Sequence, residues 1–248
     1  MIICYLTIVD EHSGSALATL VFNYARINQV PLTEFRMRLL KVFQQWGKPG
    51  AFRVDNGEPL GNPKNTNTPT SFSMWLIAHG VKMIWNAPKC PQQNGKVERM
   101  QGTSMRWAEI KSCSTIKEVQ AKLDWAIQIQ TFKYPVVRLG GKTRIEAFPC
   151  LNTKQRNWNI LDVDASRVWK FLAKKKFVRK VSSNAQISHF GMKYSIGSKY
   201  KKQYVNLIFN ADTQKWSVYD AKGDIIKTLT AHNLSLRRIL SFSVFSKN

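Results

Sequence analysis

The chain contains, at residues 91–99, the segment Pro91-Gln92-Gln93-Asn94-Gly95-Lys96-Val97-Glu98-Arg99. Proline, asparagine and glycine mark a loop, and the residues after them favour a helix, so Glu98 is expected just inside a helix. Upstream, the apolar residues 51–54 predict a short strand that ends at Asp55-Asn56-Gly57. A carboxylate at a strand end and another near the start of a later helix is an arrangement that gathers oxygen ligands around Mg²⁺ for phosphoryl transfer.

Regular structure is expected on both sides of these segments. Two β-rich runs, residues 1–9 and 16–22, predict a hairpin around the turn Asp10-Glu11-His12-Ser13-Gly14. Helical spacing of apolar residues, or a glycine stop, predicts helices at 32–46, 71–79, 94–111 and 116–131, and a further strand is expected at 81–85. Residues 135–165 read as an extended linker. Short strands are then expected at 168–172, 177–181, 186–190, 193–196, 204–209, 215–219 and 225–229, and such a series is typical of a small β-barrel.

The charge of the chain points to polyanionic partners. The 248 residues include 38 lysines and arginines against 15 acidic residues, a net charge of +23. Residues 151–248 carry 19 of the basic residues but only 5 of the acidic ones. Nucleic acid is therefore the expected partner, and the second part of the chain is the stronger candidate for gripping its backbone.

Cysteine and histidine usage excludes a zinc or disulfide framework. Cys4, Cys90, Cys113 and Cys150 form no C-x-x-C pair, and the four histidines are scattered, so reduced thiols in a cytosolic protein are expected. The apolar run 1–9 is too short to span a bilayer and lacks the basic flank of a signal peptide. We therefore expect no membrane association.

Several ordered motifs together resemble the DDE integrase and transposase superfamily, and more narrowly bacterial insertion-sequence transposases with an integrase catalytic core. The motifs are Thr7-Ile8-Val9-Asp10-Glu11-His12-Ser13-Gly14, Asp55-Asn56-Gly57, Trp85-Asn86-Ala87-Pro88, Asn94-Gly95-Lys96-Val97-Glu98-Arg99, Gln101-Gly102-Thr103 and Arg106-Trp107-Ala108-Glu109. The resemblance covers roughly residues 1–150 and, through a basic β-barrel, residues 160–230.

The resemblance implies an α/β fold. Residues 1–150 would form an RNase H-like integrase core, residues 151–165 a linker and residues 166–230 an SH3-like DNA-binding barrel, while residues 231–248 stay unassigned. It also implies three carboxylates that hold two Mg²⁺ or Mn²⁺ ions for cleavage and strand transfer of DNA. By this resemblance Asp55 is the second carboxylate and Glu98 the third. Taken singly, Asp55 is equally a turn residue before Asn-Gly, and Glu98 a first-turn helix acid.

Phosphate contacts are expected on two parts of the chain. On or near the Glu98 helix they are Asn94, Lys96, Arg99 and Arg106, whose alternative is solvated helix charge. In the barrel they are Lys174, Lys175, Lys176, Arg179, Lys180, Lys201 and Lys202, which would position DNA without reading its sequence. Most barrel aromatics are better explained as core.

Asp10 is not expected to be the first carboxylate. The family's core opens with three antiparallel strands and carries that acid on the first, whereas this chain offers two strands before its first helix. The Asp10 pattern resembles the turn between the second and third strands. We therefore expect Met1 to start about one strand too late, through a misassigned start or a truncated copy. The sheet would then have two unpaired internal edges, and the chain would be inactive as it stands.

Three hypotheses follow for function. The first is a Mg²⁺-dependent DNA strand-transferase, homo-oligomeric by resemblance and located in the bacterial cytoplasm with the nucleoid. The second is a non-enzymatic remnant of a transposase that still binds double-stranded DNA. The third, an unrelated RNA-binding protein, is disfavoured because nothing resembles an aromatic RNA-binding motif on a sheet.

Overall fold

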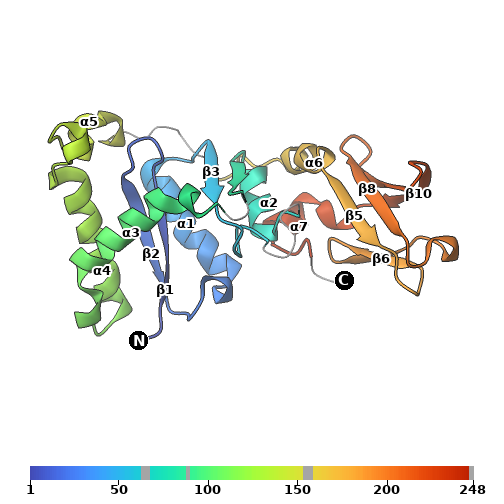
Figure 1. Ribbon diagram of the computed structural model, residues 1–248, viewed down its shortest axis with the longest axis horizontal. Helices are drawn as coiled ribbons and strands as arrows, with labels where there is room; N and C mark the ends of the chain where they lie inside the picture. Colours follow the sequence, from blue (N-terminus) through green and yellow to red (C-terminus); the bar gives the residue numbers. More distant parts are fainter. Residues whose placement is uncertain (63–67, 88–89, 153–158, 246–248) are drawn as a thin grey trace. The chain divides into compact units, whose positions relative to one another are not determined.

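The computed structural model describes residues 1–62, 68–87, 90–152 and 159–245. It is a mixed α/β structure in two units (Figure 1). The first unit comprises Met1–Pro49 and Trp85–Asn159, and the second comprises Gly50–Ile84 and Ile160–Asn248. Each unit therefore combines segments that are distant in sequence.

The first unit opens with the predicted hairpin. Strand β1, Cys4–Val9, pairs antiparallel with β2, Ala16–Phe22, and Thr7 lies opposite Thr19. The far edge of β2 is covered by Gln120, whose side chain accepts from the Val21 N–H at 3.0 Å and donates to the Thr19 carbonyl at 2.8 Å. A side chain that satisfies strand-edge groups in this way removes them from pairing with another strand.

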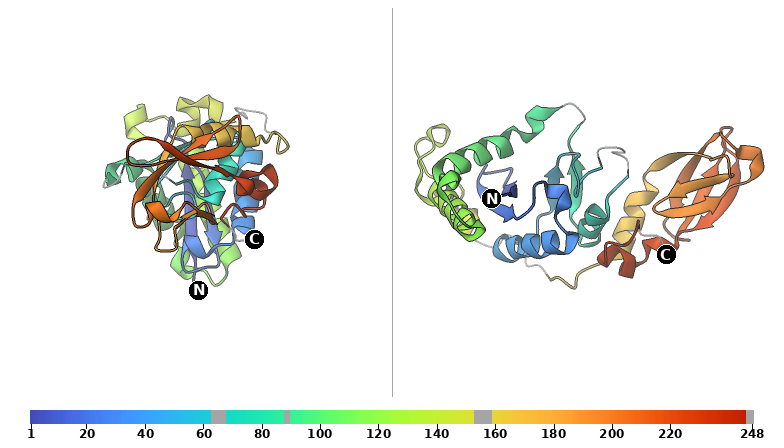
Figure 2. Two further views of the ribbon diagram at one scale, coloured as in Figure 1. Left: turned by 90° about the vertical axis from the view of Figure 1, so that its right-hand side faces the viewer. Right: turned by 90° about the horizontal axis from the view of Figure 1, so that it is seen from below.

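Helices cover both faces of this hairpin. They are α1, Leu32–Trp46, α3, Gly95–Ala108, and α4, Ile116–Gln128, close to the predicted ranges. Neighbouring strand residues point to opposite faces. Val21 accordingly joins a buried cluster with α3 and α4, whereas Phe22 stacks on Phe35 of α1 at 5.7 Å between ring centroids. Figure 2 shows α1 on the other side of the hairpin from α4.

Short helices follow α4, which corrects the expected extended linker from residue 135. Thr143 starts α5, Arg144–Ala147, because its hydroxyl accepts from the Glu146 N–H while the Glu146 carboxylate accepts from the Thr143 N–H, a capping box. The other short helical segments of this unit are Ile27–Gln29, Pro91–Asn94, Ile110–Ser112, Ile129–Lys133, Val137–Leu139 and Pro149–Asn152.

The second unit begins with the segment that carries Asp55. Strand β3, Ala51–Val54, and β4, Lys82–Trp85, share a two-stranded sheet, and helix α2, Ser71–Ala78, lies between them in sequence. All eight residues of α2 are buried, as expected of a helix that is apolar on every side. The Thr70 hydroxyl accepts from the Ser73 N–H at 3.1 Å and caps the helix.

The strand expected at residues 168–172 is wrong, because this segment belongs to helix α6, Ala165–Ala173. The Asp164 carboxylate accepts from the Ser166 N–H at 2.8 Å and caps the helix. Val168 and Leu172 are buried on one face. The last carbonyl of α2, on Ala78, accepts from the Asp164 N–H and from Arg167, so α6 satisfies the end of α2.

Six short strands follow α6, near the predicted positions. Strands β5, Lys176–Lys180, β8, Tyr204–Asn210, β9, Lys215–Tyr219, and β10, Ile225–Thr230, form an antiparallel sheet in the order β10-β9-β8-β5. Strands β6, Gln186–His189, and β7, Met192–Ser195, form a separate hairpin. In the described residues no sheet closes on itself, so the SH3-like barrel stays a prediction.

The chain end packs within the second unit. A 3₁₀-helix at His232–Leu234 leads into α7, Leu236–Leu240. Phe242 stacks on Phe72 of α2 at 5.5 Å, and the buried Asn233 amide donates to the carbonyls of Phe190 and Val244. Residues 231–245, for which the sequence predicts no element, therefore join α2 to the second unit's strands.

The β1–β2 and β3–β4 pairs form two separate sheets in the part of the chain that the structure describes. That the core sheet lacks its first strand stays a prediction. No described helix is long and apolar enough to cross a membrane. The four cysteines are free.

Candidate functional site

Asp55 stands at the exit of β3 in a tight turn. Its Oδ1 accepts from the Gly57 N–H at 3.0 Å, and a Cβ on Gly57 would lie 3.2 Å from that same oxygen. A Cβ on Gly61 would meet the Asn56 backbone at 2.5 Å, so this loop tolerates only glycine there. Asp55 remains exposed. The turn thus holds the carboxylate out of the sheet, as its sequence predicts.

Glu98 lies in the first turn of α3 and is exposed. The loop before it is tied by two side-chain bonds. The Asn86 amide donates to the Asn94 side-chain oxygen at 2.6 Å, and Gln93 accepts from the Ala87 N–H at 2.9 Å. The first motif, which starts at Trp85, and the second, which starts at Asn94, therefore meet at the start of the helix that carries Glu98. Pro88, the last residue of the first motif, lies outside the described part.

The exposed face of α3 presents one acid among cations. Arg99, Gly102 and Arg106 are exposed with Glu98, and positions 98, 102 and 106 repeat at four-residue spacing along one side. A Cβ on Gly102 would meet no heavy atom within 4 Å. This glycine leaves the helix backbone open to an approaching chain, because no side chain covers it.

Two of the expected phosphate contacts already have protein partners. Lys96 donates to the Glu11 carbonyl at 2.7 Å and so ties α3 to the β1–β2 turn. Asn94 accepts from Asn86. Of the four residues expected near Glu98, Arg99 and Arg106 are therefore the better placed for a ligand.

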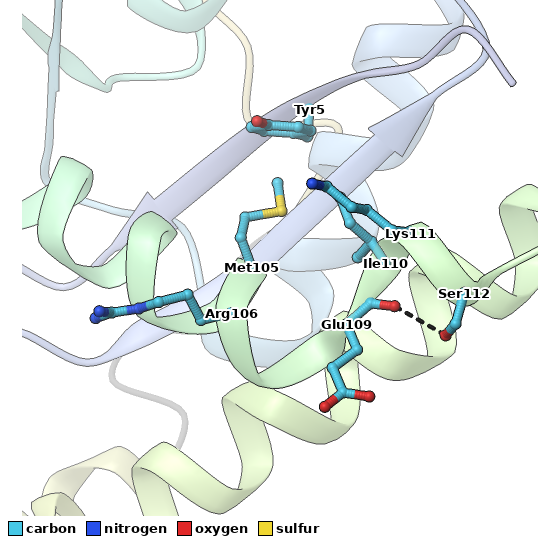
Figure 3. A pocket seen from close by; sticks show the side chains of 7 residues that line it. All are labelled: Tyr5, Met105, Arg106, Glu109, Ile110, Lys111 and Ser112. Atoms are coloured by element: carbon cyan, nitrogen blue, oxygen red, sulfur yellow. Dashed lines mark hydrogen bonds between the residues drawn. The ribbon is translucent and has the colours of Figure 1, made fainter.

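A pocket of about 560 Å³ lies in the first unit beside β1 and the end of α3. It is lined by Tyr5, Met105, Arg106, Glu109, Ile110, Lys111 and Ser112. In Figure 3 Tyr5, Met105 and Lys111 point toward one another, whereas the charged ends of Arg106 and Glu109 point away. The Ser112 hydroxyl donates to the Glu109 carbonyl at 2.9 Å and closes the turn below. The pocket is thus mostly apolar, and it brings none of the expected metal ligands together.

Asp10 is held by its own turn. Its Oδ2 accepts from the N–H and the hydroxyl of Ser13, and its backbone pairs with Ser15 and Gly14. A carboxylate engaged in closing a hairpin agrees with the prediction that Asp10 is a turn residue.

Asp55 and Glu98 have the donor chemistry that Mg²⁺ prefers. Asp55 belongs to the second unit and Glu98 to the first. No group of three His, Cys, Asp or Glu side chains suited to a metal ion occurs in the described residues. Because Asp55 and Glu98 have no third partner among the described residues, they do not complete the three-carboxylate site that the sequence resemblance implies.

The lysines expected to bind phosphate in the second unit differ in accessibility. Lys174, Lys176, Lys180, Lys201 and Lys202 are exposed. Lys175 and Arg179 are half-buried, and burial lowers the pKa of each. Arg179 lies on the same inner face of β5 as Phe177, and its guanidinium lies 5.9 Å from the Phe177 ring centre. It is consequently less accessible than the five exposed lysines of the predicted set.

Sequence reasoning missed His189 on the inner side of the same unit. It is 1% exposed among Phe177, Phe190 and Trp216, with its ring 4.3 Å from that of Trp216. Burial, with a smaller contribution from Arg179, lowers its pKa to about 2. Only the alternation of strand β6 could have indicated that His189 faces inward.

The structure is similar to several solved retroviral integrases. The catalytic core of HTLV-2 integrase, solved in complex with magnesium in a trimeric form, has 19% identity and a TM-score of 0.41 over 58% of this chain and 84% of its own. The catalytic core of BIV integrase gives 19% and 0.41 over 59% and 91%. A simian T-cell lymphotropic virus intasome complex gives 14% and 0.45 over 92% and 73%. No family model matches the sequence.

Proposed function

We propose that this chain is a DNA-binding protein of the integration and transposition type, similar to insertion-sequence transposases of the DDE class. The observation that carries the proposal is the exposed face of α3, where Glu98 stands with Arg99 and Arg106 around the uncovered Gly102. An acid framed by cations on an open helix surface suits a site at which a phosphodiester backbone meets a metal ligand. The turn after β3 supplies Asp55, the second carboxylate of the proposed site.

In this proposal Asp55 and Glu98 are the second and third of three carboxylates for Mg²⁺ or Mn²⁺, and the first is not among residues 1–248. On its own the chain binds double-stranded DNA without cutting it. The alternative is a remnant that binds DNA and has no metal chemistry at all. The two differ in whether Asp55 and Glu98 bind a metal ion in the DNA complex.

The remaining parts of the proposal concern the second unit and the assembly. The SH3-like closure of residues 166–230, the domain limits at residues 150 and 165, a homo-oligomer on DNA and a bacterial cytoplasmic location with the nucleoid all rest on the sequence resemblance. The exposed lysines of the second unit support the DNA-gripping part.

The test is the salt dependence of duplex DNA binding by the full chain, measured by fluorescence anisotropy. The logarithm of the binding constant should fall steeply and linearly with the logarithm of salt concentration, because phosphate contacts release counterions. Lys180→Ala should reduce the slope by about 1. Lys222→Ala is the matched control, since this exposed lysine lies in a turn with Asp220 and Asp224. A flat salt response of the wild-type chain would contradict the proposal.

A cleavage assay on the same duplex tests the predicted inactivity. Wild-type chain with Mg²⁺ or Mn²⁺ should leave both strands intact. Strand cleavage that disappears in Asp55→Asn or Glu98→Gln would show that the residues present form a complete site, and that the predicted inactivity is wrong.

A further inference from the structure

One end of the four-stranded sheet exposes an aromatic ring among lysines. Tyr204 begins β8 and is 61% exposed, and Val178 on β5 is 52% exposed. Lys180 lies directly opposite Tyr204 in the β5–β8 pairing, and its ammonium is 5.9 Å from the ring centre. Directly opposed residues of antiparallel strands point to the same face, so the ring and the ammonium share this surface.

The same face extends beyond the strand pair. Val178 is two residues before Lys180 and therefore also points outward, diagonal to Tyr204. The turn that leads into β8 holds the exposed Lys201 and Lys202. This turn is fixed to the end of β5, because the Val181 N–H donates to the Gln203 carbonyl and the Lys202 N–H donates to the Val181 carbonyl.

The positive charge of the sheet favours a negatively charged partner. Strands β5, β8, β9 and β10 contain Lys176, Arg179, Lys180, Lys215 and Lys227 and no acidic residue. The turn between β9 and β10 holds Asp220 and Asp224, but Asp220 accepts from the N–H groups of Lys222 and Asp224 and so serves its own turn. The exposed ring thus stands in a positive field.

We propose that Tyr204, with Val178 as its apolar neighbour and Lys180, Lys201 and Lys202 around it, is a binding site for unpaired DNA in which a nucleobase stacks on the tyrosine ring. This inference rests on the proposed DNA-binding function. Single-stranded DNA offers flat apolar base faces and phosphates together, whereas an intact duplex hides its base faces in the stack and offers phosphates alone. An aromatic platform inside a basic surface is the combination that binds single strands without sequence preference.

The alternative occupant is a protein, including a second copy of this chain. A surface of net positive charge disfavours self-association, because two copies would place like charges against each other. The exposed ring and lysines are complementary to a polyanion with accessible aromatic faces.

The test compares an oligothymidine strand with a blunt duplex of equal length, both bound by the full chain at one salt concentration. Tyr204→Ala should weaken oligothymidine binding roughly five- to hundredfold, the effect of losing one base stack, and leave duplex binding unchanged. Tyr204→Phe keeps the ring and should bind both probes like the wild type. Ile225→Ala removes another exposed apolar side chain, 62% exposed, from the same sheet and should change neither.

Each of the following results would contradict one part of the proposal. Unchanged oligothymidine binding by Tyr204→Ala would overturn the stacking site, while a steep salt dependence of duplex binding would leave the proposed function standing. Equal weakening for both probes would overturn the preference for unpaired bases. Loss of wild-type self-association in Tyr204→Ala with DNA binding intact would assign the ring to a protein contact. Binding of neither probe by the wild type would overturn the proposed function itself.

Discussion

The Asp10 carboxylate accepts two hydrogen bonds from Ser13, one from its N–H at 2.8 Å and one from its hydroxyl at 2.6 Å. Asp10 follows directly after β1, so its position at a strand end would suggest that it is the first carboxylate of a metal site. Its Oδ2 instead closes the β1–β2 turn, where the Gly14 N–H also donates to the Asp10 carbonyl. Asp55 differs from Asp10 because its carboxylate accepts one turn hydrogen bond instead of two and because the residue is exposed, whereas Asp10 is half-buried. This difference separates a hairpin acid from a candidate ligand.

Asp10→Ala should therefore act on stability. Loss of both Ser13 bonds should lower the free energy of unfolding by about 1 to 2 kcal/mol in urea denaturation. Asp10→Asn keeps an acceptor and should cost less. Duplex DNA binding by the folded variants should be unchanged. Weaker DNA binding by Asp10→Asn at full stability would show that the carboxylate acts at the DNA interface.

Gly102→Ala should raise stability and weaken DNA binding, whereas Asp10→Ala should lower stability and leave binding unchanged. Alanine is the better helix former by about 1 kcal/mol, and a Cβ here meets no neighbour. Thermal unfolding should therefore move to higher temperature, while duplex binding weakens because the new methyl group stands where the DNA backbone approaches. Ala121→Gly on the exposed side of α4 is the control, with lower stability and unchanged binding. Gly102→Ala with wild-type affinity would remove this face of α3 from the DNA interface.

The sequence predicted the elements that local pattern determines and missed those that tertiary packing determines. The hairpin, strand β3 and helices α1 and α4 have strong periodicity and lie where expected. Residues 168–172 read as a strand because the run Val-Trp-Lys-Phe-Leu is apolar and short. The Asp164 cap and the spacing of Ala165, Val168 and Leu172 were the helical signals.

The candidate site also has parts that local sequence predicts and parts that depend on tertiary packing. The Asp55 turn and the position of Glu98 on α3 follow from local sequence, and both are present. The bond from Lys96 to the Glu11 carbonyl joins residues far apart in the chain and leaves no local pattern. The inward direction of Arg179 could be predicted from the sequence. Residues two apart on a strand share a face, and Phe177 faces the core.

His189 should make the second unit sensitive to acid. Its pKa in the folded chain is about 2 against an ordinary value of 6.5, so the unfolded chain binds the proton first as pH falls. The histidine's contribution to stability is present above pH 6.5 and is lost progressively below it, by at most about 1.4 kcal/mol per pH unit. Arg179, the nearby cation, opposes protonation in the fold.

Urea denaturation at a series of pH values checks this dependence. His189→Phe, which matches its aromatic neighbours, should flatten the decline below pH 6.5, whereas the exposed His232→Gln should not. An unchanged decline in His189→Phe would assign the acid sensitivity to other groups.

Asn233 should be needed for the docking of the chain end. Its amide, fully buried, donates to the carbonyls of Phe190 and Val244. Asn233→Ala leaves both carbonyls without this donor and should lower the free energy of unfolding by about 1 to 3 kcal/mol. It should also speed proteolysis after residue 235. The exposed neighbour variant His232→Ala should do neither, and wild-type resistance of Asn233→Ala would show that packing of Phe242 holds the tail.

Binding of Mn²⁺ to the complex of the chain with duplex DNA, followed by the electron paramagnetic resonance of free Mn²⁺, decides whether Asp55 and Glu98 serve one ion. Two carboxylates and a DNA phosphate are sufficient donors for one divalent ion. We expect Asp55→Asn and Glu98→Gln each to weaken Mn²⁺ binding about tenfold or more, with no further loss in the double variant, because the proposed site assigns both residues to the same ion. Glu109→Gln, an exposed acid at the end of α3, is the control. Mn²⁺ binding that is unchanged in the double variant would contradict the assignment of both residues to a metal-dependent DNA site.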